Sequence, residues 1–409
     1  MAAGIGQRSR QGSGFSRFEV VIAGGGVAAL ETALALRGMA AHRVALTFVS
    51  PSTDFALAPL AVGAPFAVAH IPSWPLADIA GELGADHIAA ALTSVDPRAH
   101  RVQLSDGTQL DYQALVLALG ARRYPPFRHA RTFFAEDAPE LLGGLVADLE
   151  QGWSKSVAFV VPPTVEWTLP AYELALLTAR DVNAMGIDDA QITIVTPEER
   201  PLALFGPAAG TAVAELLGEA GIAIECGARV EAVSGGSLSL GADRRPLHAE
   251  RVVALPLLEG RRIDGLPHDA HGFLPIDEHA AVRGIQDVFA AGDGTDFPVK
   301  QGGIGTQQAD AAAERIAARA GSNVTPQPFR PVLRGWLMTG EARRYFANPI
   351  APGGGVGATS LEPLWWPPTK IAGRYLAPWL ATHAQPPHAA TPGGDMHTEA
   401  HPAIDDSSR

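Results

Sequence analysis

Three small residues, Gly24, Gly26 and Ala29, stand in the pattern G-x-G-x-x-A directly after the apolar run 18–23. Glycine at Gly24 permits a tight turn, and the missing side chain at Gly26 lets a pyrophosphate approach the backbone. Ala29 allows the helix that follows to pack closely on the strand, and the start of that helix offers free N–H groups to phosphates. The pattern therefore predicts a dinucleotide-binding turn; the alternative is a glycine turn without a ligand.

The end of the next strand departs from this fingerprint, which usually places an acidic residue there to bond a ribose hydroxyl. The strand 44–49 is followed by Ser50 and Pro51, and the nearest acid is Asp54. Ser50 is therefore the candidate ribose ligand, and a weaker one than a carboxylate.

Two further apolar segments end in small residues. The segment 111–121 closes around Gly120, and the segment 287–293 closes on Gly292 and Asp293. Together with the glycine turn, in this order and spacing, these segments resemble the pyridine nucleotide-disulfide oxidoreductase superfamily, and the resemblance covers roughly residues 18–345.

Within that superfamily, the segments 54–60 and 293–303 are similar to those of sulfide:quinone oxidoreductases, flavocytochrome c sulfide dehydrogenases and type II NADH dehydrogenases. The resemblance implies that the cofactor is FAD, that Asp293 bonds its ribityl chain and that Pro59 packs near the flavin ring. It also implies that a helix starting near Gly302 points its N-terminus at the flavin C2 carbonyl. That helix end and Lys300 would stabilise negative charge on reduced flavin, unless Lys300 is an exposed loop residue.

A second strand–turn–helix unit opens with the turn 161–167, which contains no glycine. Pro162 and Pro163 lack N–H donors, and Glu166 puts negative charge where phosphates would bind. Trp167 fills space that a nicotinamide or a pyrophosphate needs. The turn therefore predicts that NAD(P)H does not bind at the usual second site.

The chain contains a single cysteine, Cys226, which excludes an internal disulfide, a redox-active cysteine pair and a Cys-rich zinc site. Sulfide-oxidising proteins of the resembled group use paired cysteines beside the flavin, and Trp167 stands where one of them is expected. Disulfide chemistry and standard sulfide:quinone chemistry are therefore not predicted. Cys226 is interpreted as a small buried residue of a strand.

Glu166 and Glu173 are the acids expected nearest the flavin, where a partly buried carboxylate could carry protons. Glu173 lies in the predicted helix 170–180, and the two acids share one side if that helix extends back to Glu166. The alternative is that Glu173 only caps or solvates a helix face.

The C-terminal segment 328–340 resembles the start of the small domain that covers the flavin in related proteins, where it makes a dimer or membrane contact. Residues 361–380 hold three tryptophans, with Lys370 and Arg374 between apolar residues. This composition suits a peripheral membrane contact that gives access to a quinone. The alternative is that these aromatic residues pack on the core or in a homodimer interface.

Strand-like and helix-like segments alternate along the chain, which predicts an α/β fold with parallel sheets. The expected architecture is two doubly wound Rossmann-like domains and a small C-terminal domain. The predicted parts are a disordered tail (1–17), an FAD domain (18–150 and 266–322), a second domain (151–265), a C-terminal segment (323–382) and a second disordered tail (383–409). His383, His388, His397 and His401 in that tail lack ligand spacing, so no metal is predicted.

The net charge of −12 argues against general binding to nucleic-acid phosphates or anionic lipids. No secretory h-region and no run of 18 apolar residues is present, so the predicted location is cytoplasmic, with peripheral attachment to the inner face of the membrane as an alternative.

The preferred function is electron transfer from an unidentified small-molecule donor through FAD to an acceptor, for which a quinone is the candidate. Two alternatives stay open: an NAD(P)H-dependent reductase with an atypical nucleotide site, and a flavin-binding regulatory protein without turnover.

Overall fold

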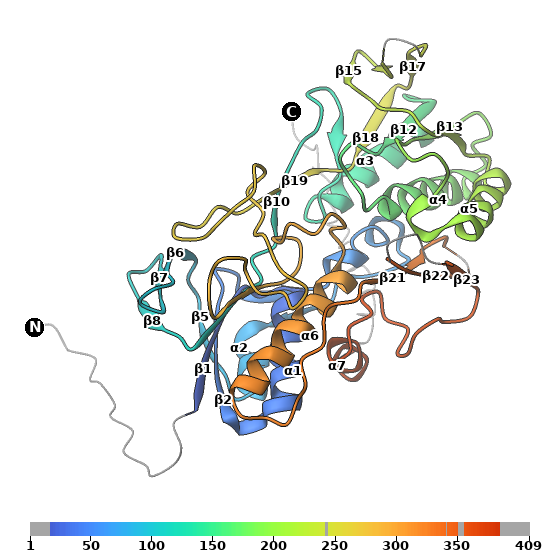
Figure 1. Ribbon diagram of the computed structural model, residues 1–409. Coiled ribbons are helices and arrows are strands. Elements are labelled where there is room, and N and C mark those ends of the chain that lie inside the picture. Colours follow the sequence, from blue (N-terminus) through green and yellow to red (C-terminus); the bar gives the residue numbers. More distant parts are fainter. Residues whose placement is uncertain (1–16, 242–243, 341, 351–355, 385–409) are drawn as a thin grey trace, which may run out of the picture.

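The computed structural model describes residues 17–241, 244–340, 342–350 and 356–384. The two predicted tails lie outside the described residues except for Arg17, His383 and Ala384. The described chain forms two α/β units with parallel sheets and a C-terminal antiparallel sheet, which confirms the predicted fold class (Figure 1).

The first unit is built on a five-stranded parallel sheet in the order β20-β9-β1-β2-β5. Its strands are β20 (Val288–Ala290), β9 (Ala114–Leu117), β1 (Phe18–Ala23), β2 (Val44–Val49) and β5 (Asp86–Ile88). The buried runs of β1 and β9 are nearly continuous, as expected for strands covered on both faces. Because β20 comes from a distant part of the sequence, the unit is discontinuous along the chain.

Helices α1 (Val27–Ala40) and α6 (Gly302–Arg319) lie side by side against this sheet (Figure 1). The two helices approach closely because small residues line their contact. A Cβ at Gly305 of α6 would lie 3.0 Å from the Cα of Gly292, which follows β20, and Gly292 lies against Ala28 of α1. The short helix α2 (Leu76–Glu82) and the three-stranded meander β6-β7-β8 complete the unit. The meander strands are β6 (Leu92–Asp96), β7 (Arg101–Leu104) and β8 (Gln109–Asp111).

The second unit has a parallel sheet in the order β11-β18-β12-β13-β14. Its strands are β11 (Arg131–Thr132), β18 (Arg251–Ala254), β12 (Ser156–Val160), β13 (Gln191–Val195) and β14 (Ala223–Glu225), and its helices are α3 (Ala138–Glu150), α4 (Leu169–Ala184) and α5 (Pro207–Glu219). A small antiparallel sheet of β15 (Ala232–Ser234), β16 (Ser237–Ser239) and β17 (Leu247–His248) is attached. Because β11 pairs with β18, this unit begins before residue 151, where the sequence placed its start.

The two units are joined by an antiparallel ribbon of β10 (Ala121–Tyr124) and β19 (Leu257–Gly260). A close approach stiffens the ribbon at Gly260, where a Cβ would overlap the carbonyl oxygen of Gly272. A short hairpin of β3 (Asp54–Ala56) and β4 (Ser73–Pro75) lies next to the first sheet.

The C-terminal segment forms an antiparallel sheet of β21 (Val332–Leu337), β22 (Arg344–Pro349) and β23 (Ala358–Ser360), followed by α7 (Leu376–Thr382). This sheet packs into the core of the second unit, whereas Leu376, Trp379 and Leu380 pack into the core of the first. The segment therefore bridges both units.

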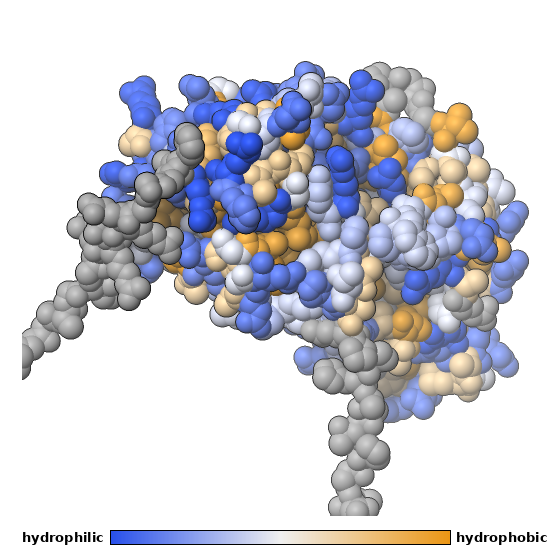
Figure 2. All heavy atoms as spheres, turned by 90° about the horizontal axis from the view of Figure 1, so that it is seen from below, coloured by the Kyte–Doolittle hydropathy of each residue, from blue (hydrophilic) through white to orange (hydrophobic). Residues whose placement is uncertain are grey.

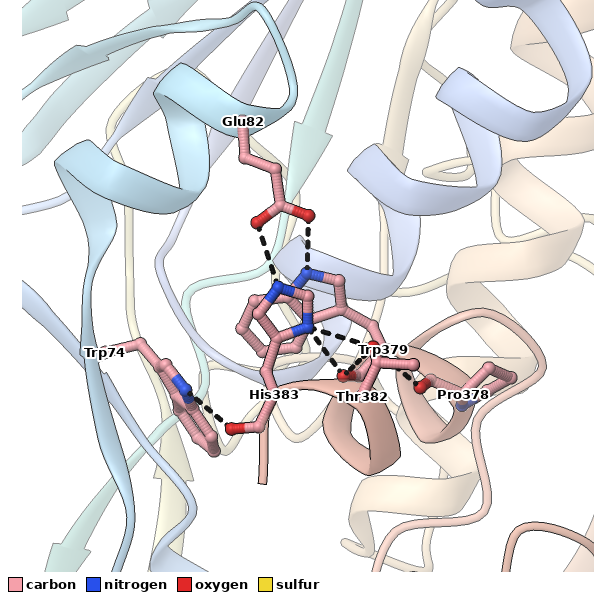
Figure 3. Close-up of polar contacts among 6 residues, drawn as sticks. All are labelled: Trp74, Glu82, Pro378, Trp379, Thr382 and His383. Atoms are coloured by element: carbon pink, nitrogen blue, oxygen red, sulfur yellow. Dashed lines mark hydrogen bonds and ion pairs between the residues drawn. The ribbon is translucent and has the colours of Figure 1, made fainter. Parts of the chain in front are cut away.

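The contacts at the end of α7 correct the expectation that His383 belongs to a disordered tail. Figure 3 shows the side chains of Trp379 and His383 meeting the carboxylate of Glu82 on α2. The rings of Trp379 and His383 are stacked with centroids 4.1 Å apart, and Trp74 Nε1 donates to the His383 carbonyl over 3.3 Å.

The face of the molecule seen in Figure 2 is mainly hydrophilic, with hydrophobic residues in separate groups. Among the described residues, no helix is long and apolar enough to cross a bilayer. The same residues contain no cluster of three or more His, Cys, Asp or Glu side chains placed to hold a metal.

Candidate functional site

A cleft of about 910 Å³ opens at the carboxyl edge of the first sheet, where ligands bind in doubly wound folds. The turn after β1 and the chain after β2 form one side of it, and the end of β9 and the β10–β19 ribbon form the other. Its lining includes Gly24, Gly26, Ser50 and Gly120 of the predicted cofactor-binding residues.

The glycine turn has the geometry that a pyrophosphate requires. Gly24 has a φ of 135°, and a Cβ there would overlap the carbonyl oxygen of Ala118. Gly26 precedes α1 and has no atom within 4 Å of the place of a Cβ, so the approach to the helix end is open. No side chain caps α1 and its first turn contains no acid. The free N–H groups at the start of α1 can therefore donate hydrogen bonds to a phosphate. The residues present at this turn fit FAD.

Ala29 and Ser50 support this turn in different ways. Ala29 is fully buried between helix and sheet, which is the packing role that its small size predicted. Ser50 is 3% exposed, and its Oγ accepts a hydrogen bond from the Ser52 amide over 3.2 Å. The Ser50 hydroxyl is thus held at the cleft wall by its own loop.

The two small-residue turns meet next to Gly120, which lines the cleft, whereas Gly292 and Asp293 do not belong to its lining. Gly120 has a φ of 64°, and a Cβ at Gly294 would lie 3.1 Å from the Gly120 carbonyl oxygen. The Gly292 amide donates to Gln308 Oε1 of α6 over 2.8 Å. Burial raises the pKa of Asp293, and the charges of Lys300 and Arg123 act against that shift. Asp293 therefore lies in the field of two cations.

Lys300 is partly buried, so it is not an exposed loop residue. Its Nζ donates to the Thr295 carbonyl and lies 3.7 Å from the centroid of the Phe273 ring. Burial lowers the pKa of Lys300 to about 8, against the opposing influence of Asp293. The ammonium can therefore gain or lose a proton close to neutral pH.

The start of α6 is partly closed. Gly302 is its first residue, and the side chain of Gln301 already accepts the Ile304 amide proton over 2.9 Å. Apolar Ile371 from the C-terminal segment lies against Gly302, because a Cβ there would lie 2.5 Å from the Ile371 Cδ1. Pro59 lies partly buried in the short 3-10 turn 58–60. The predicted cofactor-binding residues that are not part of the cleft lining are Ala29, Pro59, Gly292, Asp293, Lys300 and Gly302.

The corresponding crevice of the second unit is filled by the protein itself. Trp167 packs edge-on against Phe205 with centroids 5.9 Å apart, and its ring reaches Gly335 of β21. Pro162 is buried and Glu166 is exposed. Helix α4 begins at Leu169, so the condition under which Glu166 and Glu173 would share one helical side is not met.

A partly buried carboxylate that the sequence analysis missed lies in this crevice. Glu198 follows β13, where the acid of a dinucleotide-binding fingerprint would bond a ribose. Its place after this strand is the sequence signal from which Glu198 could have been predicted. Its oxygens accept from Tyr172 Oη (2.7 Å), Thr196 Oγ1 (2.9 Å), Ala203 N (3.0 Å) and Thr168 Oγ1 (3.1 Å). Because these four donors already occupy the oxygens of Glu198, the carboxylate has little capacity left to bond a nucleotide.

Glu173 has a structural partner instead of a place in the cleft. It is 1% exposed and forms an ion pair with Lys370, and it accepts the Met338 amide proton over 2.9 Å. Lys370 also donates to the Trp336 carbonyl over 2.8 Å. Burial raises the pKa of Glu173, and Lys370 opposes that rise. The pair joins α4 to the C-terminal segment.

Comparison with known proteins was consistent with this geometry. Residues 171–315 match the family described as pyridine nucleotide-disulphide oxidoreductase. An NADH dehydrogenase-like protein of Mycobacterium tuberculosis is 28% identical over 230 residues, which are 54% of this chain and 57% of that protein. The alignment thus spans just over half the length of that relative.

Two further proteins are similar over more of the chain. The ferredoxin reductase component of a chlorobenzene dioxygenase from a Cupriavidus species is 28% identical over 318 residues, 73% of this chain and 72% of that one. The sulfide:quinone oxidoreductase of Aquifex aeolicus superposes with a TM-score of 0.74 at 21% identity, covering 84% of this chain and 86% of that one. The predicted resemblance is confirmed: residues 171–315 match the pyridine nucleotide-disulphide oxidoreductase family, and the chain has the fold of the sulfide:quinone oxidoreductase.

Proposed function

We propose that this protein is a flavoenzyme that accepts electrons from a donor other than NADH or NADPH and passes them through FAD to a quinone. The observation that carries the proposal is the filled crevice of the second unit. Trp167 packs against Phe205, and Glu198 accepts four internal hydrogen bonds, beside the turn where a nicotinamide nucleotide would be expected to bind.

The single cysteine restricts the chemistry further. Cys226 is partly buried, and burial raises the pKa of its thiol, which disfavours the reactive thiolate. Without a second cysteine the protein cannot cycle a disulfide. The proposal therefore relies on the flavin alone as the redox group.

When bound, FAD supplies the one- and two-electron chemistry. The chain contributes the binding and electrostatic groups. The α1 N-terminus would receive the pyrophosphate, Asp293 would accept a hydrogen bond from the ribityl chain as the family resemblance implies, and Lys300 would hold a positive charge below about pH 8. That charge would favour a negatively charged reduced flavin.

An NAD(P)H-dependent reductase is the second candidate, favoured by the name of the NADH dehydrogenase-like relative. It requires the crevice around Trp167 to open, which would expose the buried Glu198 cluster.

An anaerobic absorbance titration of the FAD-loaded protein separates the two. NADH, NADPH and sulfide are added in turn and the flavin absorbance is followed; dithionite-reduced protein is then mixed with a soluble quinone. The proposal expects no bleaching by either nicotinamide nucleotide or by sulfide, and rapid return of the oxidised spectrum with quinone. Bleaching by NADH or NADPH within seconds would refute it in favour of the second candidate.

A further inference from the structure

One wall of the cofactor cleft carries four arginines: Arg122 and Arg123 on β10, and Arg261 and Arg262 just after β19. We refer to these residues as the arginine wall. The glycine turn and Ser50 line the same cleft on its other side. Such a concentration of cations stands out in a chain whose net charge is −12.

Each arginine of the wall is fixed by a partner of its own. Arg122 pairs with Glu259 at 3.1 Å, and Arg123 pairs with Glu136 at 3.1 Å. Arg261 Nε donates to the Leu119 carbonyl over 3.2 Å, and an Arg262 nitrogen donates to the Ala270 carbonyl over 2.8 Å. A guanidinium has five N–H donors, so each retains donors for an anion in the cleft.

The wall is also supported by a rigid platform. Arg122 stands opposite Glu259 in the antiparallel register of β10 and β19, and Gly260 is pressed against Gly272. The positive charge of Arg123 also acts on Asp293, because it lowers the pKa of that carboxyl against the effect of burial. Groups that are held in place before a ligand arrives lose little conformational entropy when they bind it.

We propose that the arginine wall is the second half of the cofactor's phosphate site, facing the glycine turn across the cleft. Backbone N–H groups at the start of α1 receive the pyrophosphate from one side, and guanidinium groups of the wall neutralise it from the other. The wall compensates for the ribose end, where Ser50 replaces the usual acid. This inference rests on the proposed function only in taking FAD as the ligand.

The wall has two physical consequences for binding. Because its arginines are partly exposed, their attraction for phosphate is screened by salt, so FAD affinity should fall as ionic strength rises. Only the pyrophosphate of the cofactor would contact the arginine wall. The affinity for ADP should therefore depend on the wall as the affinity for FAD does, whereas the affinity for riboflavin should not.

The test uses the full-length apoprotein and measures FAD binding by quenching of flavin fluorescence, and ADP binding by competition with FAD, at low and high salt. The variant is the double substitution Arg123→Gln and Arg261→Gln. The matched control is Arg128→Gln with Arg131→Gln, two exposed arginines of the neighbouring groove 125–132 that lie outside the cleft lining. Melting temperatures of the apoproteins verify that all variants are folded.

The double variant should bind FAD and ADP at least roughly tenfold more weakly at low salt, because two charge-assisted contacts are lost, and its affinity should depend less on salt than that of the wild type. The control should match the wild type. Equal FAD affinity and equal salt dependence in the double variant and the control would overturn the proposal. Because no turnover is involved, that result would leave the question of the electron donor untouched.

Discussion

Gly24 and Gly26 lie two residues apart and yet differ in what a side chain would meet. At Gly24 a Cβ would overlap the Ala118 carbonyl and the φ is 135°, so Gly24→Ala should destabilise the fold by about 3 kcal/mol. At Gly26 the space is empty, so Gly26→Ala should leave the apoprotein stable and weaken FAD binding by crowding the pyrophosphate. Urea unfolding of both apoproteins, with FAD titrations of Gly26→Ala, tests this. A stable Gly24→Ala variant with normal FAD affinity would contradict the assignment.

The ion pair between Glu173 and Lys370 indicates whether Glu173 has a catalytic or a structural role. Lys370 is 7% exposed, so removing its partner leaves a buried unpaired charge. Glu173→Gln should therefore cost about 3–5 kcal/mol, whereas Glu173→Leu combined with Lys370→Met should recover most of it. Chemical denaturation measures both. If Glu173→Gln is as stable as the wild type and only slows reoxidation of the flavin, Glu173 is instead a proton carrier.

At the scale of elements, α1, α6 and α7 meet around two carboxyl groups. Glu31 of α1 is fully buried and accepts the amide protons of Tyr375 (2.9 Å) and Leu376 (2.7 Å) at the start of α7. Asp310 of α6 shares a hydrogen bond with Glu31. Burial, followed by the charge of Glu31, raises the pKa of Asp310 to about 9, while Arg374 opposes and Glu314 adds to that rise. Asp310 is thus protonated at neutral pH.

This raised pKa makes stability depend on pH with a definite sign. The unfolded chain releases the Asp310 proton near pH 4, whereas the folded protein keeps it until about pH 9. The stabilisation is therefore complete below about pH 4 and is lost as the pH rises to about 9. Asp310→Asn, which cannot ionise, should gain on the wild type by at most about 1.4 kcal/mol per pH unit in that interval. Urea unfolding between pH 5 and pH 9 measures the difference, with Glu219→Gln, at an exposed carboxyl of α5, as the control that keeps the slope.

The same elements show which features could be predicted from the sequence and which could not. Local signals were sufficient for the glycine turn, for the strand–helix–strand order and for the loss of the second fingerprint, because each depends on neighbouring residues. Partners far apart in the sequence were not accessible: Glu173 meets Lys370 across 197 positions, and Glu31 meets Leu376 across 345. No pattern within α1 or α4 indicates that these acids are buried and paired, because tertiary packing decides it.

At the scale of the whole molecule, the C-terminal segment ties the two units together. It is anchored to α4 through Lys370, to the start of α6 through Ile371, to α1 through Glu31 and to α2 through Glu82. Since the cofactor cleft and the filled crevice belong to different units, this segment fixes their relative position. It thereby uses most of the aromatic and apolar residues that the sequence analysis considered for a membrane contact.

This use of the segment argues against strong membrane binding through 361–380. Of its larger apolar residues, Ile371, Leu376, Trp379 and Leu380 are buried, and only Leu361 (58%) and Trp366 (85%) are largely exposed among the described ones. Two such side chains on a protein with a net charge of −12 offer little affinity for an anionic bilayer. Cosedimentation with phosphatidylglycerol vesicles should therefore leave most of the protein in the supernatant, and the double substitution Leu361→Ser and Trp366→Ser should change nothing. Strong sedimentation that this substitution abolishes would instead show that the segment 361–380 binds the membrane.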